Sequence, residues 1–136
     1  MKITRKTALG LLAVLLVLLL FGTQMPGAWR DEAVAATRMP WQITKVAHFV
    51  IFASMACVAR LPPLRWTLVW VGCAALALAL LTEALQHFAA NRDPSWKDVG
   101  IDMAGALVGV VLARVATCIN LRVWCGVFSS RENREI

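Results

Sequence analysis

The sequence predicts an all-α polytopic membrane protein, a bundle of four transmembrane helices with both termini in the cytoplasm. Hydrophobic side chains make up 60% of the 136 residues, against roughly 45–50% in soluble domains. Four spans of roughly 20 residues would use about 80 apolar positions, which is close to the number available. Mean hydropathy is +0.68 and only 16% of residues are charged, which excludes a disordered chain and an ordinary soluble domain.

The first expected span covers about residues 7–25. Lys2, Arg5 and Lys6 precede an uncharged apolar run from Ala8 to Phe21, and a cleaved signal peptide can begin in the same way. A signal peptide needs small residues in an A-x-A pattern soon after the apolar run, and the segment from Gly22 to Trp29 has none. We therefore favour an uncleaved membrane anchor.

Three more spans follow within a single domain over residues 1–136. The second covers about 43–60 and ends before Pro62 and Pro63, because consecutive prolines terminate a helix. The third, 65–88, contains the longest uncharged run, and the fourth, 98–119, follows a turn-like segment around Pro94. The polar residues 129–136 are expected to form a mobile cytoplasmic tail.

The orientation follows from the positive residues, which are retained on the cytoplasmic side of a membrane. With the N-terminus inside, the cytoplasmic segments carry Lys2, Arg5, Lys6, Arg60, Arg65, Arg114, Arg122, Arg131 and Arg134, against Arg30, Arg38, Lys45, Arg92 and Lys97 outside. The formal charge of +6 is thus explained largely by topology, and we expect no nucleic-acid partner because the chain has no basic stripe with interleaved aromatic residues.

The cysteines predict neither disulfides nor a metal site. Cys57, Cys73 and Cys118 lie within apolar runs, and Cys125 lies on the expected cytoplasmic side. No two of them share a C-x-x-C spacing, and none pairs with another outside the membrane. We expect the cysteines to pack between helices, with no metal and no cofactor in the protein.

Polar residues gather where the second and fourth spans begin and the third ends, all at the outer membrane face. Helical spacing places Lys45 with His48, Glu83 with Gln86, and Asp98 with Asp102, each pair on one face of its helix. A charged side chain within a span needs a partner or a function. The sequence therefore predicts an outer-face polar pocket formed by Lys45, His48, Glu83, Gln86, Arg92, Asp98 and Asp102. Small residues on the same faces predict close helix packing at Gly72, Ala75, Ala79, Gly105 and Gly109. Ion pairs that only hold the helices in register are the alternative.

These residues resemble the pattern of VanZ-like membrane proteins. The similarity covers about residues 40–112 and comprises Lys45-x-x-His48-Phe49-x-x-Phe52, Thr82-Glu83-x-x-Gln86-x-Phe88-x-x-x-Arg92 and Asp98-x-x-x-Asp102-x-x-Gly105-Ala106-x-x-Gly109. The resemblance implies a small four-span protein of the bacterial inner membrane, in a family named after an accessory factor in glycopeptide (teicoplanin) resistance. Two positions depart from the family pattern: Thr44 stands where an Asp is common, and Asp102 where an Asn is usual.

We expect an accessory binding role in cell-envelope or lipid-linked glycan processes. The partners would be membrane lipids, a lipid-linked intermediate or lipoglycopeptide at the outer face, and an envelope protein. An intramembrane enzyme acting on a lipid phosphate or envelope precursor is one alternative, although the sequence has no recognisable catalytic motif beyond the cluster of Lys, His, Glu, Arg and Asp. A small transporter or an assembly partner of an envelope complex is another.

Overall fold

The computed structural model describes residues 3–23, 42–90 and 95–132. Within these ranges the chain is all-α, with four helices and no strand: α1 (Arg5–Thr23), α3 (Gln42–Arg60), α4 (Leu68–Ala90) and α5 (Trp96–Glu132). Three segments are long and apolar enough to cross a membrane, namely Arg5–Thr23, Leu68–His87 and Trp96–Ile119. Large apolar side chains on these helices are exposed, as expected of surfaces that face lipid.

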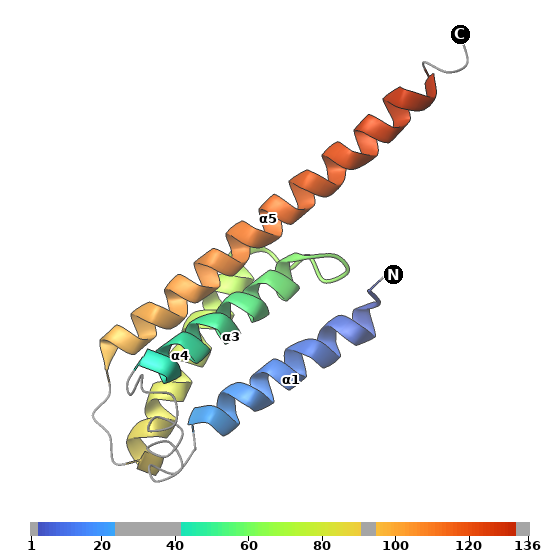
Figure 1. Ribbon diagram of the computed structural model, residues 1–136. Helices are drawn as coiled ribbons and strands as arrows, with labels where there is room; N and C mark the ends of the chain where they lie inside the picture. The colour runs from blue at the N-terminus through green and yellow to red at the C-terminus, as the bar shows by residue number, and fades with distance from the viewer. Residues whose placement is uncertain (1–2, 24–41, 91–94, 133–136) are drawn as a thin grey trace.

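The helix boundaries lie near those predicted, with one large difference. The fourth span was predicted to end near Ile119, which is also where the apolar segment of α5 ends, but the helix itself continues to Glu132, into the segment expected as a mobile tail from Ser129. The chain has no proline after Pro94, so no residue there breaks the helix. At 1.5 Å per residue, its 37 residues extend for about 55 Å, and the helix projects well beyond the other three (Figure 1).

The four helices alternate in direction. Helices α3 and α5 run parallel, because contacts that advance along α3 also advance along α5, from Lys45 beside Asp98 to Ala53 beside Gly109. The described N- and C-terminal ends therefore lie at the same end of the bundle (Figure 1). We call this the basic end, where Arg5, Arg60 and Arg65 lie, and the other the polar end, where Lys45, Glu83 and Asp98 lie.

The closest helix packing is between α3 and α5, and two glycines allow it. A Cβ atom on Gly105 would lie 2.5 Å from the carbonyl oxygen of Phe49, and one on Gly109 would lie 2.8 Å from the carbonyl carbon of Ala53. The sequence predicted close helix packing at both glycines, and the structure shows that the neighbouring backbone is that of α3. Other buried small residues contribute to the core, including Ala56, Ala59, Ala75, Ala79, Ala106 and Ala113.

A tight turn joins α3 to α4 at the basic end. The backbone N–H of Trp66 donates to the carbonyl of Ala59 over 2.9 Å, and the N–H of Leu64 donates to the carbonyl of Leu61 over 3.1 Å. Arg65 adopts a positive φ of 51°, in the left-handed region that few side chains occupy. These bonds hold Trp66 beside the last turn of α3.

Candidate functional site

Two charged pairs join α3 to α5 at the polar end. Lys45 Nζ lies 3.1 Å from Asp98 Oδ1, and His48 Nδ1 lies 3.3 Å from Asp102 Oδ1. Both pairs arise because α3 and α5 are parallel neighbours, so residues one turn apart on α3 meet residues one turn apart on α5. The helical spacing predicted which residues share a face, whereas the partner of each residue emerges only from the packing.

The second pair is deeply buried. Asp102 is 2% exposed and His48 is 8% exposed. The Nε2 atom of His48 is also buried and has no hydrogen-bond partner among the described residues. Because a buried polar atom without a partner is unfavourable by about 1–3 kcal/mol, Nε2 marks a position where a ligand atom or a water molecule would be stabilised.

Helix α4 contributes a third side of the cluster. Glu83 Oε2 accepts a hydrogen bond from the backbone N–H of Ser95 over 2.9 Å, which satisfies a free donor just before α5 begins. Gln86 is 8% exposed and Thr82 is 1% exposed, and the Thr82 hydroxyl donates to the carbonyl of Ala79. Ser95 and Thr82 were not among the predicted site residues, although the capping position of Ser95 was a usable signal.

The structure thus gathers most of the predicted polar residues at one end of the bundle. Lys45, His48, Asp98 and Asp102 pair directly, and Glu83 and Gln86 are buried at the same end. Arg92 lies outside the described residues. Of the predicted packing residues, Ala75 and Ala79 are buried, whereas nothing lies within 4 Å of where a Cβ on Gly72 would be.

The charges of the cluster favour hydrogen-bond donors in a ligand. Its described side chains hold three carboxylates, Glu83, Asp98 and Asp102, and one lysine that already pairs with Asp98. Carboxylates only accept hydrogen bonds, so hydroxyl, amide or ammonium groups suit this end better than a phosphate does. Among the residues that the structure describes, no group of three or more His, Cys, Asp or Glu side chains is arranged to hold a metal ion.

Comparison with known families shows which family the chain belongs to. Residues 7–117 match the family described as VanZ/LLP1. The chain belongs to the VanZ/LLP1 family. The match covers most of the chain and confirms the resemblance seen in the polar and glycine positions. No curated protein matches the chain, and no solved structure does. Together with its three apolar helices, the family indicates a membrane protein.

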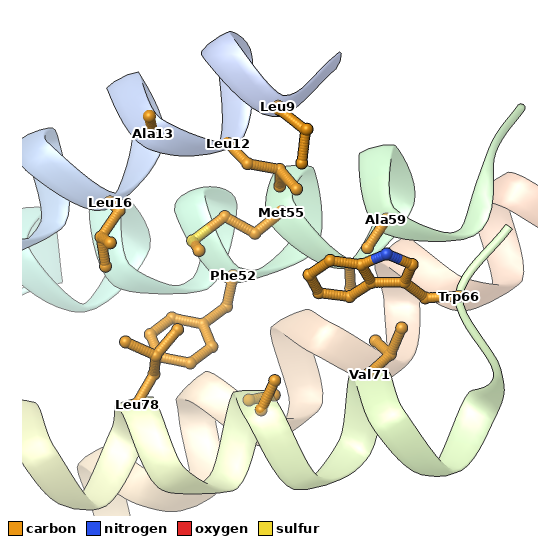
Figure 2. Close-up of a pocket in the computed structure, with 13 residues that line it drawn as sticks. Leu9, Leu12, Ala13, Leu16, Phe52, Met55, Ala59, Trp66, Val71 and Leu78 are labelled. Carbon is orange, nitrogen blue, oxygen red and sulfur yellow. The ribbon is translucent and has the colours of Figure 1, made fainter. Parts of the chain in front are cut away.

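This VanZ/LLP1 protein also has an apolar cavity that the sequence did not predict. It occupies about 300 Å³ between α1, α3 and α4, toward the basic end. Figure 2 shows apolar side chains converging on it from all three helices, with the Trp66 ring at one side. The residues that line it mix leucines with small alanines such as Ala59 and Ala75. Composition alone could not reveal it, because every apolar helix face in a membrane protein looks alike in sequence.

Proposed function

We propose that this VanZ/LLP1 protein crosses the bacterial cytoplasmic membrane four times, with both termini in the cytoplasm. Helix α3 would be the fourth span, since its 19 residues extend about 28 Å, close to the roughly 30 Å of a bilayer core. Its polar side chains Lys45 and His48 face α5, which fits a helix that buries its polar groups within the bundle. The basic end would face the cytoplasm, where positive residues are retained.

We further propose that the polar end binds the headgroup of an envelope amphiphile in an accessory role. The observation that supports this most is the unpartnered His48 Nε2, buried beside a carboxylate-rich cluster. If Asp102 accepts the proton of His48 Nδ1, then Nε2 of the neutral ring is an acceptor. The ligand class is therefore an amphiphile rich in hydroxyl or amine donors, such as a lipid-linked glycan intermediate or a lipoglycopeptide.

The chemistry explains why several helices contribute to such a site. Sugar hydroxyl groups and amines need acceptors at fixed positions, and Asp102 and Glu83 are held by His48 and by the Ser95 N–H. Each additional hydrogen bond to a desolvated charged group contributes about 1.5–3 kcal/mol. A lipid anchor would keep the ligand at the membrane face, so a few such bonds are sufficient. A link to glycopeptide resistance follows if the bound amphiphile is the drug or its lipid-linked target.

Binding to the purified protein in lipid nanodiscs tests this proposal. The probes are a lipoglycopeptide and a lipid-linked disaccharide, each compared with the same molecule lacking its lipid chain. We expect His48→Ala to weaken binding about tenfold, because it removes the acceptor that the headgroup would use. His87→Ala is the matched control, since His87 is an exposed histidine one turn beyond Glu83 on the same helix. Equal affinities for the two variants would contradict the proposal.

One feature favours a second candidate, a hydrolase acting on an ester of an envelope precursor. A histidine held at Nδ1 by a buried carboxylate, with Nε2 left free, has the arrangement of a general base. His48 Nε2 would take a proton from water while the water oxygen attacks the ester; the bond to the leaving oxygen would break, and that oxygen would receive the proton from Nε2. Turnover of an envelope lipid by purified protein, lost in His48→Ala and reduced in Asp102→Asn, would favour this candidate. Binding without turnover favours the accessory role.

A further inference from the structure

The charges of the described residues are unevenly distributed along the bundle. Up to Ile119, the described carboxylates Glu83, Asp98 and Asp102 all lie at the polar end, with Lys45 and Lys97, whereas Arg5, Lys6, Arg60, Arg65 and Arg114 lie toward the basic end. The turn from Arg60 to Thr67 holds two arginines and no acidic residue. The basic end therefore presents several cations to the adjoining leaflet, and anionic lipid headgroups are attracted to such clusters.

The apolar cavity begins next to these cations. Ala59 lines it in the last turn of α3, Trp66 lines it in the turn, and Val71 lines it near the start of α4. Arg60 directly follows Ala59, and its Nη1 donates to the carbonyl oxygen of Trp66. The cavity thus runs from the level of the arginines into the apolar interior of the bundle, alongside α1 (Figure 2).

Arg60 retains unused hydrogen-bonding capacity at this position. Its Nε atom is buried and has no hydrogen-bond partner among the described residues. A guanidinium donates five hydrogen bonds in a fixed fork that suits phosphate oxygens. Arg65 is exposed one residue before Trp66, and indole rings commonly lie at the headgroup level of a bilayer. Arg60 thus lies next to Ala59 and Trp66, which line one end of the apolar cavity, and an arginine beside an apolar cavity supplies the two parts of a phospholipid site.

We propose that the cavity binds one acyl chain of an anionic phospholipid, whose phosphate is held by Arg60 and Arg65. The apolar cavity wall contributes close packing without hydrogen bonds, which is the main attraction between apolar groups inside a bilayer. The arginines supply the selectivity: each basic residue near an anionic surface strengthens binding about fivefold. Two of them give a preference of about 30-fold over a zwitterionic lipid with the same chains.

Native mass spectrometry of the purified full-length protein tests the proposal. The probes are phosphatidylglycerol and phosphatidylcholine with identical acyl chains, added in competition. We expect one tightly retained lipid per protein, predominantly phosphatidylglycerol. Arg60→Gln should reduce the preference for phosphatidylglycerol about fivefold, whereas Lys97→Gln, which removes an exposed cation at the polar end, should leave it unchanged.

The cavity itself is tested by filling it. Ala13→Trp places an indole into the cavity from α1 and should abolish retention of both lipids. Val14→Trp is the matched control, because Val14 is exposed and does not line the cavity. Ala74→Leu fills the same space from α4 and replaces Ala13→Trp if that variant fails to fold.

Three results would overturn the proposal. The first is equal retention of the two lipids by the unaltered protein, and the second is retention of lipid by both filled variants. The third is a dimer that forms in the unaltered protein and is lost in Ala13→Trp, since a second copy of the chain would then occupy the cavity. None of these results depends on whether His48 binds a ligand at the other end.

Discussion

Replacing Gly109 with alanine should destabilise the bundle, because the glycine lets α5 approach the backbone of α3. An added Cβ would lie 2.8 Å from the carbonyl carbon of Ala53 and 3.0 Å from its Cα, both of them main-chain atoms that cannot rotate away. At Gly105 the Cβ would lie 2.5 Å from the carbonyl oxygen of Phe49. A comfortable carbon–oxygen contact between helices is about 3.3 Å, so each substitution must push the helices apart by roughly 0.8 Å or more.

The free-energy change follows from two opposing terms. Forcing an extra methyl group into a packed interface is unfavourable by about 1–3 kcal/mol. Alanine also favours the helix by about 1 kcal/mol relative to glycine. We expect a net loss of up to about 2 kcal/mol for each single variant. A shift of this size at Gly105 would also lengthen the nearby contact between His48 and Asp102, which is 3.3 Å and already at the long limit of a hydrogen bond.

Unfolding of the purified protein by SDS titration in mixed micelles measures the effect. Gly100→Ala is the matched control: Gly100 lies on the same helix, and nothing lies within 4 Å of the position that its Cβ would take. That variant should be unchanged or slightly more stable, since only the helix-propensity term applies. If Gly109→Ala proved as stable as Gly100→Ala, the close approach of α5 to α3 would be refuted.

Three further predictions concern the polar end and the topology. Asp102→Ala should lower the free energy of unfolding by about 1–3 kcal/mol, because it leaves both ring nitrogens of buried His48 without partners. SDS unfolding of this variant, compared with that of Asp98→Ala, measures the loss. A double-mutant cycle on Lys45 and Asp98 should give a coupling of only about 0.2–1 kcal/mol that weakens with salt, since both side chains are about one-third exposed. In a variant with every cysteine replaced by serine, Asp93→Cys should react with an impermeant thiol reagent outside intact cells, while fluorescent protein fusions at both termini should report the cytoplasm.

The helices were predictable because membrane insertion imposes strong rules on sequence. Runs of apolar residues, the prolines after α3 and the turn-like sequence before α5 placed all four helices within a few residues of their observed starts. The end of α5 was not predictable in the same way, because polarity does not stop a helix. Residues beyond Ile119 are more polar than those before it, yet none of them is a proline, so the backbone stays helical to Glu132.

The site was predictable as a set of residues but not as a set of contacts. Helical periodicity put His48 on the face of Lys45 and Asp102 on the face of Asp98. Periodicity could not decide whether Gly105 faces α3 or α4, since both helices carry small residues that could pack against it. The direct contact between α3 and α5 settled that choice, and with it the partner of His48. The lipid cavity required the position of α1, about which the periodicity of its uncharged apolar run from Ala8 to Phe21 carries no information.

Helix α3 packs more closely against α5 than against α1, and this difference bears on how the polar end and the cavity influence each other. Helix α3 contributes to both sites, with His48 at the polar end and Ala59 beside the cavity. It is fixed against α5 by main-chain contacts at Gly105 and Gly109, whereas its contact with α1 is less extensive. A lipid entering or leaving the cavity would therefore displace α1 more easily than α3. Lipid binding would then leave the contact between His48 and Asp102 unchanged. The two sites should therefore behave independently, as separated positions without shared partners usually do.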